Sequence, residues 1–133
     1  MVPITLTYGA ILGLMMAVLS IRVPIRRGIL DVPFGDGGDV PLATRIRAFG
    51  NFVEYVPMIV LLMALAEVSG TNPGVLHVSG MALVLSRLVH AVAYRGRSEL
   101  TLAEKVGRGI GALSTWTVLF GLSAYLLLTG AFG

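Results

Sequence analysis

The sequence predicts an all-α integral membrane protein built from four transmembrane helices. Hydrophobic residues make up 56% of the 133-residue chain and charged residues only 13%, and the mean hydropathy is +0.87. An ordinary soluble domain carries about 25% charged residues, and a disordered chain lacks this apolar content. The apolar residues also fall into four stretches that are each long enough to cross about 30 Å of hydrocarbon. We therefore expect a four-helix bundle in a membrane, formed as a single domain by residues 1–133.

The first expected span covers residues 4–23, and the chain carries no charge before Arg22. A cleaved signal peptide would have basic residues before the apolar stretch, whereas here the arginines follow it. Residues 24–41 are expected to form a loop, because they are rich in the prolines and glycines that interrupt helices. Three aspartates lie in the same segment. It is too short to form a domain.

Three further spans follow. The second covers residues 42–69 and ends at a turn rich in glycine and proline, and the third covers residues 75–94. Residues 95–107 are polar, and residues 109–133 are free of charge and supply the fourth span. Glu67 stands near the outer end of the second span, where we expect its carboxylate to extend toward the headgroups.

The basic residues are distributed asymmetrically along the chain. All ten lie in or beside the first and third connections, or in the helix halves next to them. The positive-inside rule therefore places both termini outside and the loops 24–41 and 95–107 in the cytoplasm, with the inner membrane as the location in a bacterium. Because these residues form no continuous basic face, we expect membrane lipid and not nucleic acid as a partner.

The chain contains no cysteine. It therefore offers neither a disulfide framework nor a zinc–thiolate site, and we expect no metal centre. A cysteine nucleophile is equally excluded. Any thiol chemistry must use a thiol that belongs to the substrate.

Polar side chains stand within the second and third spans, where charges are costly, and this makes them candidate functional residues. In each span three of them lie at helical spacing on one face. We expect neighbouring helices to bring the two faces together, with room for an ion pair between Glu54 and Arg87. Interhelical polar contacts contribute only about 0.6 kcal/mol each, so gluing the bundle does not account for the whole set. The six residues are Arg47, Asn51 and Glu54 in the second span, and Arg87, His90 and Tyr94 in the third.

Two of these segments resemble the motifs of a known family. Residues 47–57 have the sequence RAFGNFVEYVP. This is similar to the signature R-A-x-x-N-x-x-E-x-x-P of the membrane-associated proteins in eicosanoid and glutathione metabolism, the MAPEG family. Residues 87–94, RLVHAVAY, resemble the matching third helix of that family. The resemblance covers about residues 22–128, and its two motifs occur in the right order in a chain with four spans.

The resemblance implies a homotrimer of four-helix subunits. It further implies that glutathione, the co-substrate, lies between neighbouring subunits near the cytoplasmic side. Residues on the second and third helices would bind its polar groups, and a basic pair after the first helix would meet a ligand carboxylate. By this analogy the glutathione-binding residues are Arg47, Asn51, Glu54, Arg87, Tyr94, Arg26 and Arg27, while His90 and Lys105 have a structural or supporting role.

The family's thiolate-stabilising arginine stands at the start of the fourth helix. Arg108 is the best match, in a pattern Arg-x-x-Gly-x-x-x-Thr completed by Gly111 and Thr115, and Lys105 is the competing candidate. An ordinary thiol has a pKa near 8.5 and is only a few per cent thiolate at neutral pH. A guanidinium at a helix N-terminus would stabilise the anion, and we expect Arg108 to hold such a position.

The resemblance therefore implies a membrane-embedded glutathione transferase or peroxidase. Arg108 would be the catalytic residue, and the thiolate would attack a lipophilic electrophile or hydroperoxide that arrives through the bilayer. Phe49 and Gly50 stand where several members carry histidine and arginine, and Ala112 stands where some carry tyrosine. Two alternatives stay open: a non-catalytic protein of the same fold that binds a lipid or peptide, and a small transporter that uses Glu54 as a proton-coupled site.

Overall fold

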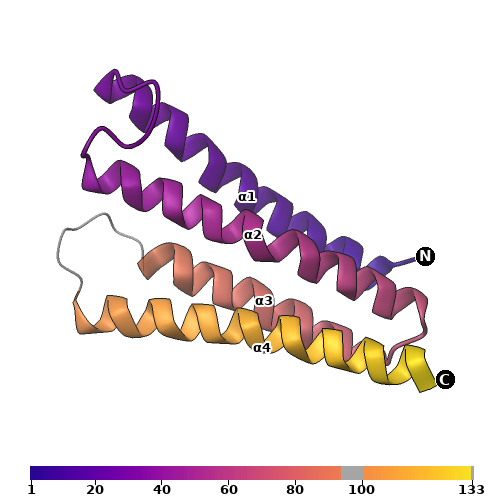
Figure 1. Ribbon diagram of the computed structural model, residues 1–133. Helices are drawn as coiled ribbons and strands as arrows, with labels where there is room; N and C mark the ends of the chain where they lie inside the picture. Colours follow the sequence, from indigo (N-terminus) through magenta and orange to yellow (C-terminus); the bar gives the residue numbers. More distant parts are fainter. Residues whose placement is uncertain (94–100, 133) are drawn as a thin grey trace.

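The protein is a bundle of four long helices that run alternately up and down (Figure 1). The computed structural model describes residues 1–93 and 101–132. All four helices are long and apolar enough to cross a membrane, which confirms the predicted fold class. The N-terminus and the end of the last helix lie at one end of the bundle, and the loop after the first helix lies at the other (Figure 1). The helices are α1 (Pro3–Leu30), α2 (Val40–Val68), α3 (Pro73–Ala93) and α4 (Leu102–Phe132).

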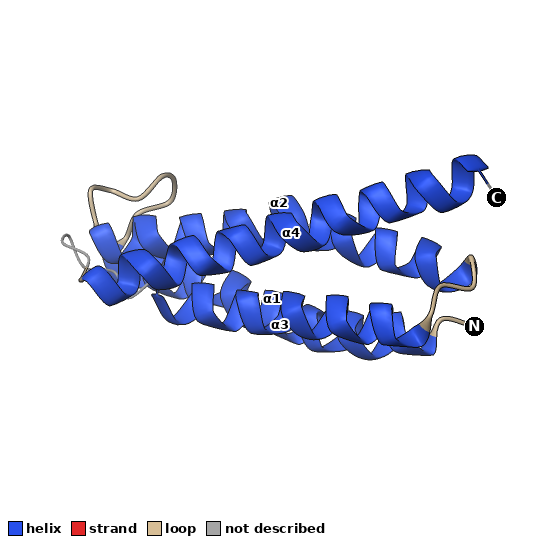
Figure 2. Cartoon of the chain, turned by 90° about the horizontal axis from the view of Figure 1, so that it is seen from below, coloured by secondary structure: helices blue, strands red, loops and turns tan. Residues whose placement is uncertain are grey.

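A compact apolar core runs along the axis of the bundle. Figure 2 shows the helices running lengthwise beside one another, closer together at one end than at the other. The outward faces are also apolar, because large side chains such as Leu14, Leu61 and Phe120 are exposed. A soluble protein would not expose so many, whereas lipid tails solvate them. The core residues are Leu12, Leu19, Phe52, Val56, Ile59, Met63, Leu83, Val118 and Leu122.

The first helix is longer than predicted. It continues past residue 23 to Leu30, so the loop is confined to residues 31–39 and the expectation of a loop from residue 24 is wrong. Pro24 lies inside the helix, where it removes one backbone N–H. Membrane helices tolerate such a loss, and the helix ends only where Asp31 adopts a left-handed conformation with φ 55°.

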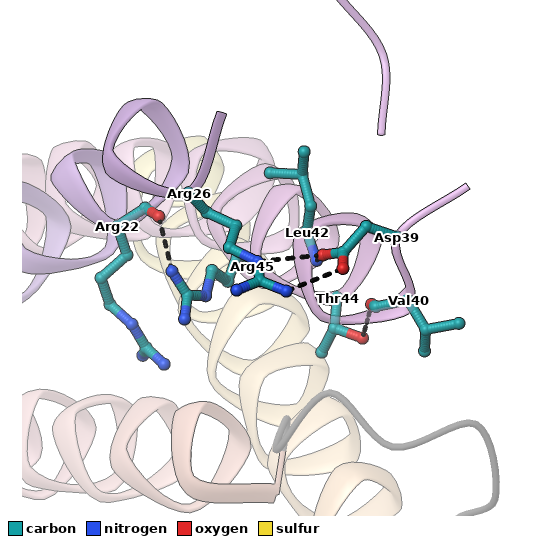
Figure 3. Close-up of polar contacts among 7 residues, drawn as sticks. All are labelled: Arg22, Arg26, Asp39, Val40, Leu42, Thr44 and Arg45. Atoms are coloured by element: carbon teal, nitrogen blue, oxygen red, sulfur yellow. Dashed lines mark hydrogen bonds and ion pairs between the residues drawn. The ribbon is translucent and has the colours of Figure 1, made fainter. Parts of the chain in front are cut away.

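Asp39 ties the end of α1 to the start of α2 (Figure 3). Its carboxylate accepts a hydrogen bond from the backbone N–H of Leu42 at 2.7 Å, which caps α2. The same carboxylate pairs with the guanidinium of Arg26 at 2.8 Å. Arg27 donates from Nη2 to the carbonyl of Gly35 at 3.2 Å. The two arginines therefore hold the 31–39 loop against the bundle.

The fourth helix begins earlier than predicted, at Leu102 and not at residue 109. Thr101 and Glu104 form a capping box: the backbone N–H of Thr101 donates to Oε2 of Glu104 at 2.8 Å, and the backbone N–H of Glu104 donates to Oγ1 of Thr101 at 3.3 Å. Arg108 therefore lies in the second turn of α4, and the expectation that it stands at the helix N-terminus is wrong.

At the opposite end of the bundle, Glu67 caps a helix other than its own. Its carboxylate accepts hydrogen bonds from the backbone N–H groups of Ile4 at 2.9 Å and Thr5 at 2.8 Å. The expectation that Glu67 extends toward the headgroups is therefore wrong. The first N–H groups of α1 have no partner within their own helix, and a nearby carboxylate satisfies them and complements the helix dipole.

The contact between α1 and α3 depends on a glycine. A Cβ atom added to Gly80 would lie 2.4 Å from the ring of Tyr8, so the two helices approach at a distance that only glycine permits. The hydroxyl of Tyr8 is hydrogen-bonded to Nδ1 of His77 at 3.1 Å, and the two rings meet edge to face.

Gly80→Ala is expected to destabilise the bundle by about 1–3 kcal/mol, the usual penalty for overpacking a close contact. The matched control is Gly13→Ala, because a Cβ at Gly13 meets nothing within 4 Å and alanine favours the helix. Thermal unfolding in detergent measures both effects. Equal stability of the two variants would contradict the close approach of α1 and α3.

A second expectation concerns the acid stability of the α1–α2 connection. The pKa of Asp39 is lowered, chiefly by its hydrogen bonds with the Arg26 guanidinium and further by the Leu42 N–H. Because the folded pKa lies below the unfolded value of about 3.9, ionised Asp39 stabilises the fold above about pH 4. That stabilisation is lost as the pH falls through the lowered folded pKa.

Asp39→Asn should therefore lower the thermal midpoint at neutral pH, and the gap from the wild type should narrow below about pH 4. The measurement is the midpoint against pH for both proteins in detergent. Asp31→Asn is the control, because it removes an acid from the same connection and asparagine tolerates the left-handed conformation found there. A constant gap at all pH values would show that Asp39 does not act through its charge.

Candidate functional site

The predicted polar faces of the second and third helices meet at a cavity that α4 completes. The cavity has a volume of about 160 Å³. Four of the predicted site residues line it, two from α2 and two from α3. The lining residues are Arg47, Asn51, Tyr55, Arg87, His90, Ala112, Thr115 and Trp116.

Arg87 is the most deeply buried charged side chain of the cavity, with 3% of its surface exposed. Its Nη2 donates to the backbone carbonyl of Gly111 at 3.0 Å and to the hydroxyl oxygen of Thr115. The Thr115 hydroxyl in turn donates to the Gly111 carbonyl at 2.8 Å. The guanidinium is therefore fixed by α4, and it presents a positive charge inside the bundle.

The contact between α3 and α4 contains two features that allow these helices to pack closely. Ser86 is hydrogen-bonded to Thr115 at 3.2 Å and donates to the carbonyl of Leu83 at 2.8 Å. A Cβ at Gly111 would lie 3.0 Å from both the Cβ of His90 and the carbonyl oxygen of Ser86. Gly111 therefore lets the backbone of α4 approach α3 closely enough for Arg87 to reach it.

Arg47 and Glu54 form a looser pair on α2. Arg47 Nη1 lies 3.9 Å from Glu54 Oε1, and the two side chains are 66% and 47% exposed. The prediction of an ion pair between Glu54 and Arg87 is therefore wrong. Arg87 is buried against α4, whereas the side chain of Glu54 is exposed. Both Arg47 and Glu54 also line a second cavity of about 400 Å³ beside the 31–39 loop, together with Asp36 and Gly50.

Arg108 lies beside the 160 Å³ cavity and not in its lining. It is half-buried. Its positive charge and that of Arg87 both lie within electrostatic range of the His90 ring. His90 is itself buried, with 6% of its surface exposed. Lys105 is exposed one turn earlier in α4. Arg108 is thus the better placed of the two candidates, although neither stands at the helix N-terminus.

Two other predicted residues, Arg26 and Arg27, are not among the residues that line this cavity. Arg26 and Arg27 are engaged with Asp39 and the 31–39 loop, as described above. Tyr94 lies outside the described residues. Their proposed contacts with glutathione stay predictions.

Sequence reasoning missed Tyr55 and Trp116 in the lining of the cavity, and Ser86 beside it. Ser86 precedes Arg87 directly, so a polar neighbour in an apolar helix was an available signal. Trp116 is 44% exposed and is the only tryptophan of the chain. Its role at the cavity follows from its position one residue after Thr115, which the hydropathy pattern does not reveal.

The cavity has the electrostatic character of an anion site. Two arginines line it, and no aspartate or glutamate does so in the described part of the chain. Guanidinium groups bind carboxylates through paired, charge-assisted hydrogen bonds. Residues 1–93 and 101–132 contain no cluster of three histidine or acidic side chains suited to a metal ion. The arrangement therefore suits a small anionic ligand.

Comparisons with known proteins agree on one family. The model of the MAPEG family matches residues 5–128. Inner membrane protein YecN of Escherichia coli K12 is 33% identical over 90 residues, which cover 68% of this chain and 69% of that protein. Its counterpart in Escherichia coli O6:H1 matches to the same extent. No solved structure gives a significant match.

Proposed function

Because the chain belongs to the MAPEG family, we propose that it is a membrane-embedded glutathione transferase or peroxidase. In this proposal it binds glutathione, stabilises the thiolate, and directs it against a lipophilic electrophile or hydroperoxide. In the transferase reaction the product would be a glutathione thioether, together with the displaced leaving group where the electrophile carries one. In the peroxidase reaction two glutathione molecules would reduce one hydroperoxide to an alcohol and water and would become oxidised glutathione. The family contains both activities.

The observation that carries the proposal is the buried guanidinium of Arg87 at a cavity shared by three helices. A charge in the bilayer is costly to maintain, so its presence favours a functional role. Glutathione carries two carboxylates and, when activated, a thiolate. A cavity with Arg47 and Arg87 in its lining offers these anions complementary charge, while Asn51 offers both a donor and an acceptor to the peptide backbone.

The volume of the cavity supports a site that is completed by a second subunit. Pockets for ligands of this size usually enclose about 300–1,000 Å³, whereas the cavity has about 160 Å³ within one chain. A neighbouring chain in a homotrimer would enclose the rest of the peptide. In such a trimer, Arg26 and Arg27 would contact glutathione in the site shared with a neighbouring chain, since they do not line the cavity of their own chain.

The relatives support the proposed location. The proteins named above are inner membrane proteins of Escherichia coli, and we propose the same compartment for this chain. The positive-inside rule orients both termini outside and the 31–39 loop toward the cytoplasm. The cavity residues Arg47, Arg87 and His90 lie in the helix halves nearest that loop, so the site would open toward the cytoplasmic glutathione pool.

The first test measures glutathione binding through Trp116. Because this is the only tryptophan and it lines the cavity, its fluorescence should change when glutathione binds. Asn51→Ala should weaken binding by about 1–3 kcal/mol, the loss expected when a polar contact is left unpaired. Asn72→Ala is the control, because it removes the same side chain from the turn at the other end of the bundle.

The proposal fails if saturating glutathione leaves the Trp116 fluorescence and an independent calorimetric titration unchanged. Equal affinity in the Asn51 variant and the wild type, with the bundle intact, would show that the carried-over binding residues are wrong. A protein that binds a lipid or a peptide instead would show no change when glutathione is added. A small transporter would show none either.

The second test separates binding from thiolate formation at Arg108. Arg108→Leu should raise the pKa of the bound thiol and slow conjugation, while much of the affinity persists through α2 and α3. Lys105→Leu should do much less, because Lys105 is exposed. Arg108→Lys should retain part of the thiolate signal, since it keeps the charge but loses the planar fork.

The measurement is thiolate absorbance against pH for the wild type and the three variants, with conjugation of a generic aromatic electrophile alongside. Loss of the thiolate in the Lys105 variant alone would assign the role to Lys105. No change in any variant would mean that the protein does not use this chemistry.

A further inference from the structure

Two arginines at the loop end of the bundle take no part in the site described above. Arg22 stands on α1 and is exposed, and Arg45 stands on α2 and is half-buried. Arg45 Nη1 donates to the backbone carbonyl of Arg22 at 3.1 Å, which brings the two residues together. Figure 3 shows that the side chain of Arg22 extends away from the ion pair of Arg26 with Asp39. The two residues therefore form a separate basic pair.

The acids at this end do not neutralise the pair. Asp39 is already bound to Arg26 at 2.8 Å, and Asp36 accepts a hydrogen bond from the N–H of Gly38 at 2.9 Å. Neither Arg22 nor Arg45 forms an ion pair with a carboxylate in the described segments. The Asp39 carboxylate also attracts Arg45 at longer range, but this one acid faces both Arg26 and Arg45. Arg22 adds a further positive charge, so the pair keeps a local excess of positive charge.

The lengths of the helices place this pair at the level of lipid phosphates. α1 and α2 have 28 and 29 residues, or about 42–44 Å at about 1.5 Å per residue, against about 30 Å of hydrocarbon. About 20 residues counted from Pro3 and from Val68 cross the hydrocarbon, so its boundary falls near residue 23 in α1 and near residue 48 in α2. Arg22 lies at that boundary, and Arg45 lies just beyond it.

The surroundings of the pair are apolar. Leu19, Ala48 and Ala91 line a notch between α1, α2 and α3 together with the two arginines. The notch encloses only about 10 Å³, so a ligand would meet its rim and not enter it. Such a rim suits a ligand with an anionic group outside and methylene groups against the helices. A free phosphate ion would gain nothing from the apolar side chains.

We propose that Arg22 and Arg45 form a binding site for the phosphate of an anionic phospholipid in the leaflet at the loop end of the bundle. The phosphate would accept hydrogen bonds from both guanidinium groups, which match its oxygens bidentately. The lipid would bridge α1 and α2 at the point where α1 continues beyond Pro24. This site is independent of glutathione binding and of the proposed activity.

The experiment is native mass spectrometry of the detergent-solubilised protein with phosphatidylglycerol and with phosphatidylcholine. The wild type should retain phosphatidylglycerol about 30-fold better, the preference expected from two basic residues near an anionic headgroup. Arg22→Gln and Arg45→Gln should each remove most of this preference. The double variant should lose little more than either single one, because both residues serve one phosphate.

Lys105→Gln is the matched control, because it removes an exposed positive charge from the same end of the bundle. An equal loss in this variant would overturn the proposal, since it would show diffuse attraction and not a site. Equal retention of the two lipids by the wild type would also overturn it. A further arm adds inorganic phosphate: displacement of the lipid by phosphate at equal concentration would identify a site for the free ion, and persistence of the lipid supports the proposal.

Discussion

The bilayer interior supplies no hydrogen-bond partners, so each polar group within the bundle must find one in the protein itself. Arg87 shows the consequence most clearly. Nη2 of its guanidinium donates to a backbone carbonyl and a hydroxyl of α4, and this fixes where α3 and α4 meet along their lengths. The carbonyl is accessible because Gly111 has no side chain to hold the helices apart. The cavity therefore lies where the buried charge of Arg87 and the missing Cβ of Gly111 bring α3 and α4 together.

The same constraint operates at both ends of the bundle, where helix termini leave N–H groups without partners. Asp39 caps its own helix and pairs with a neighbouring one, while Glu67 of α2 caps the start of α1. Each carboxylate thus links α1 to α2, one at either end. These two links set the register of the antiparallel pair, and α2 supplies three of the eight residues that line the cavity. The position of Arg47 and Asn51 relative to α3 therefore depends on contacts far from the site.

The sequence predicts the convergence of residues better than the limits of the helices. The spacing of Arg47 and Asn51, and of Arg87 and His90, was enough to bring these pairs to one cavity, because a helix face is fixed by its period. Hydropathy alone predicts the start of α4 too late, because it does not detect the capping box that Thr101 forms with Glu104. Hydropathy likewise cannot assign Trp116, since an apolar side chain that faces a cavity and one that faces lipid look alike in sequence.

The partners of individual charges were the least predictable feature, because they depend on rotation and tilt of the helices, which spacing leaves undefined. Glu54 illustrates this: it lies on the predicted face, yet its side chain is exposed beside Arg47 and makes no ion pair with Arg87. The two arginines of the cavity, Arg87 and Arg47, therefore differ in how firmly their side chains are held. Arg87 is held by α4, and moving it would leave its hydrogen bonds to the Gly111 carbonyl and the Thr115 hydroxyl unmade inside the bundle. Such a loss costs about 1–3 kcal/mol, and more for a charged group.

Arg47, in contrast, is 66% exposed, and its contact with Glu54 at 3.9 Å is of the kind that contributes little to stability. It can exchange that partner for a ligand carboxylate at small cost. Arg47 also lines both cavities, so a ligand bound in one would alter the charge that faces the other. Under the proposed function, a fixed cation inside and an adjustable cation at the mouth would allow a flexible anionic peptide to bind at one end first. Its second end would then bind as Arg47 exchanges Glu54 for a ligand carboxylate.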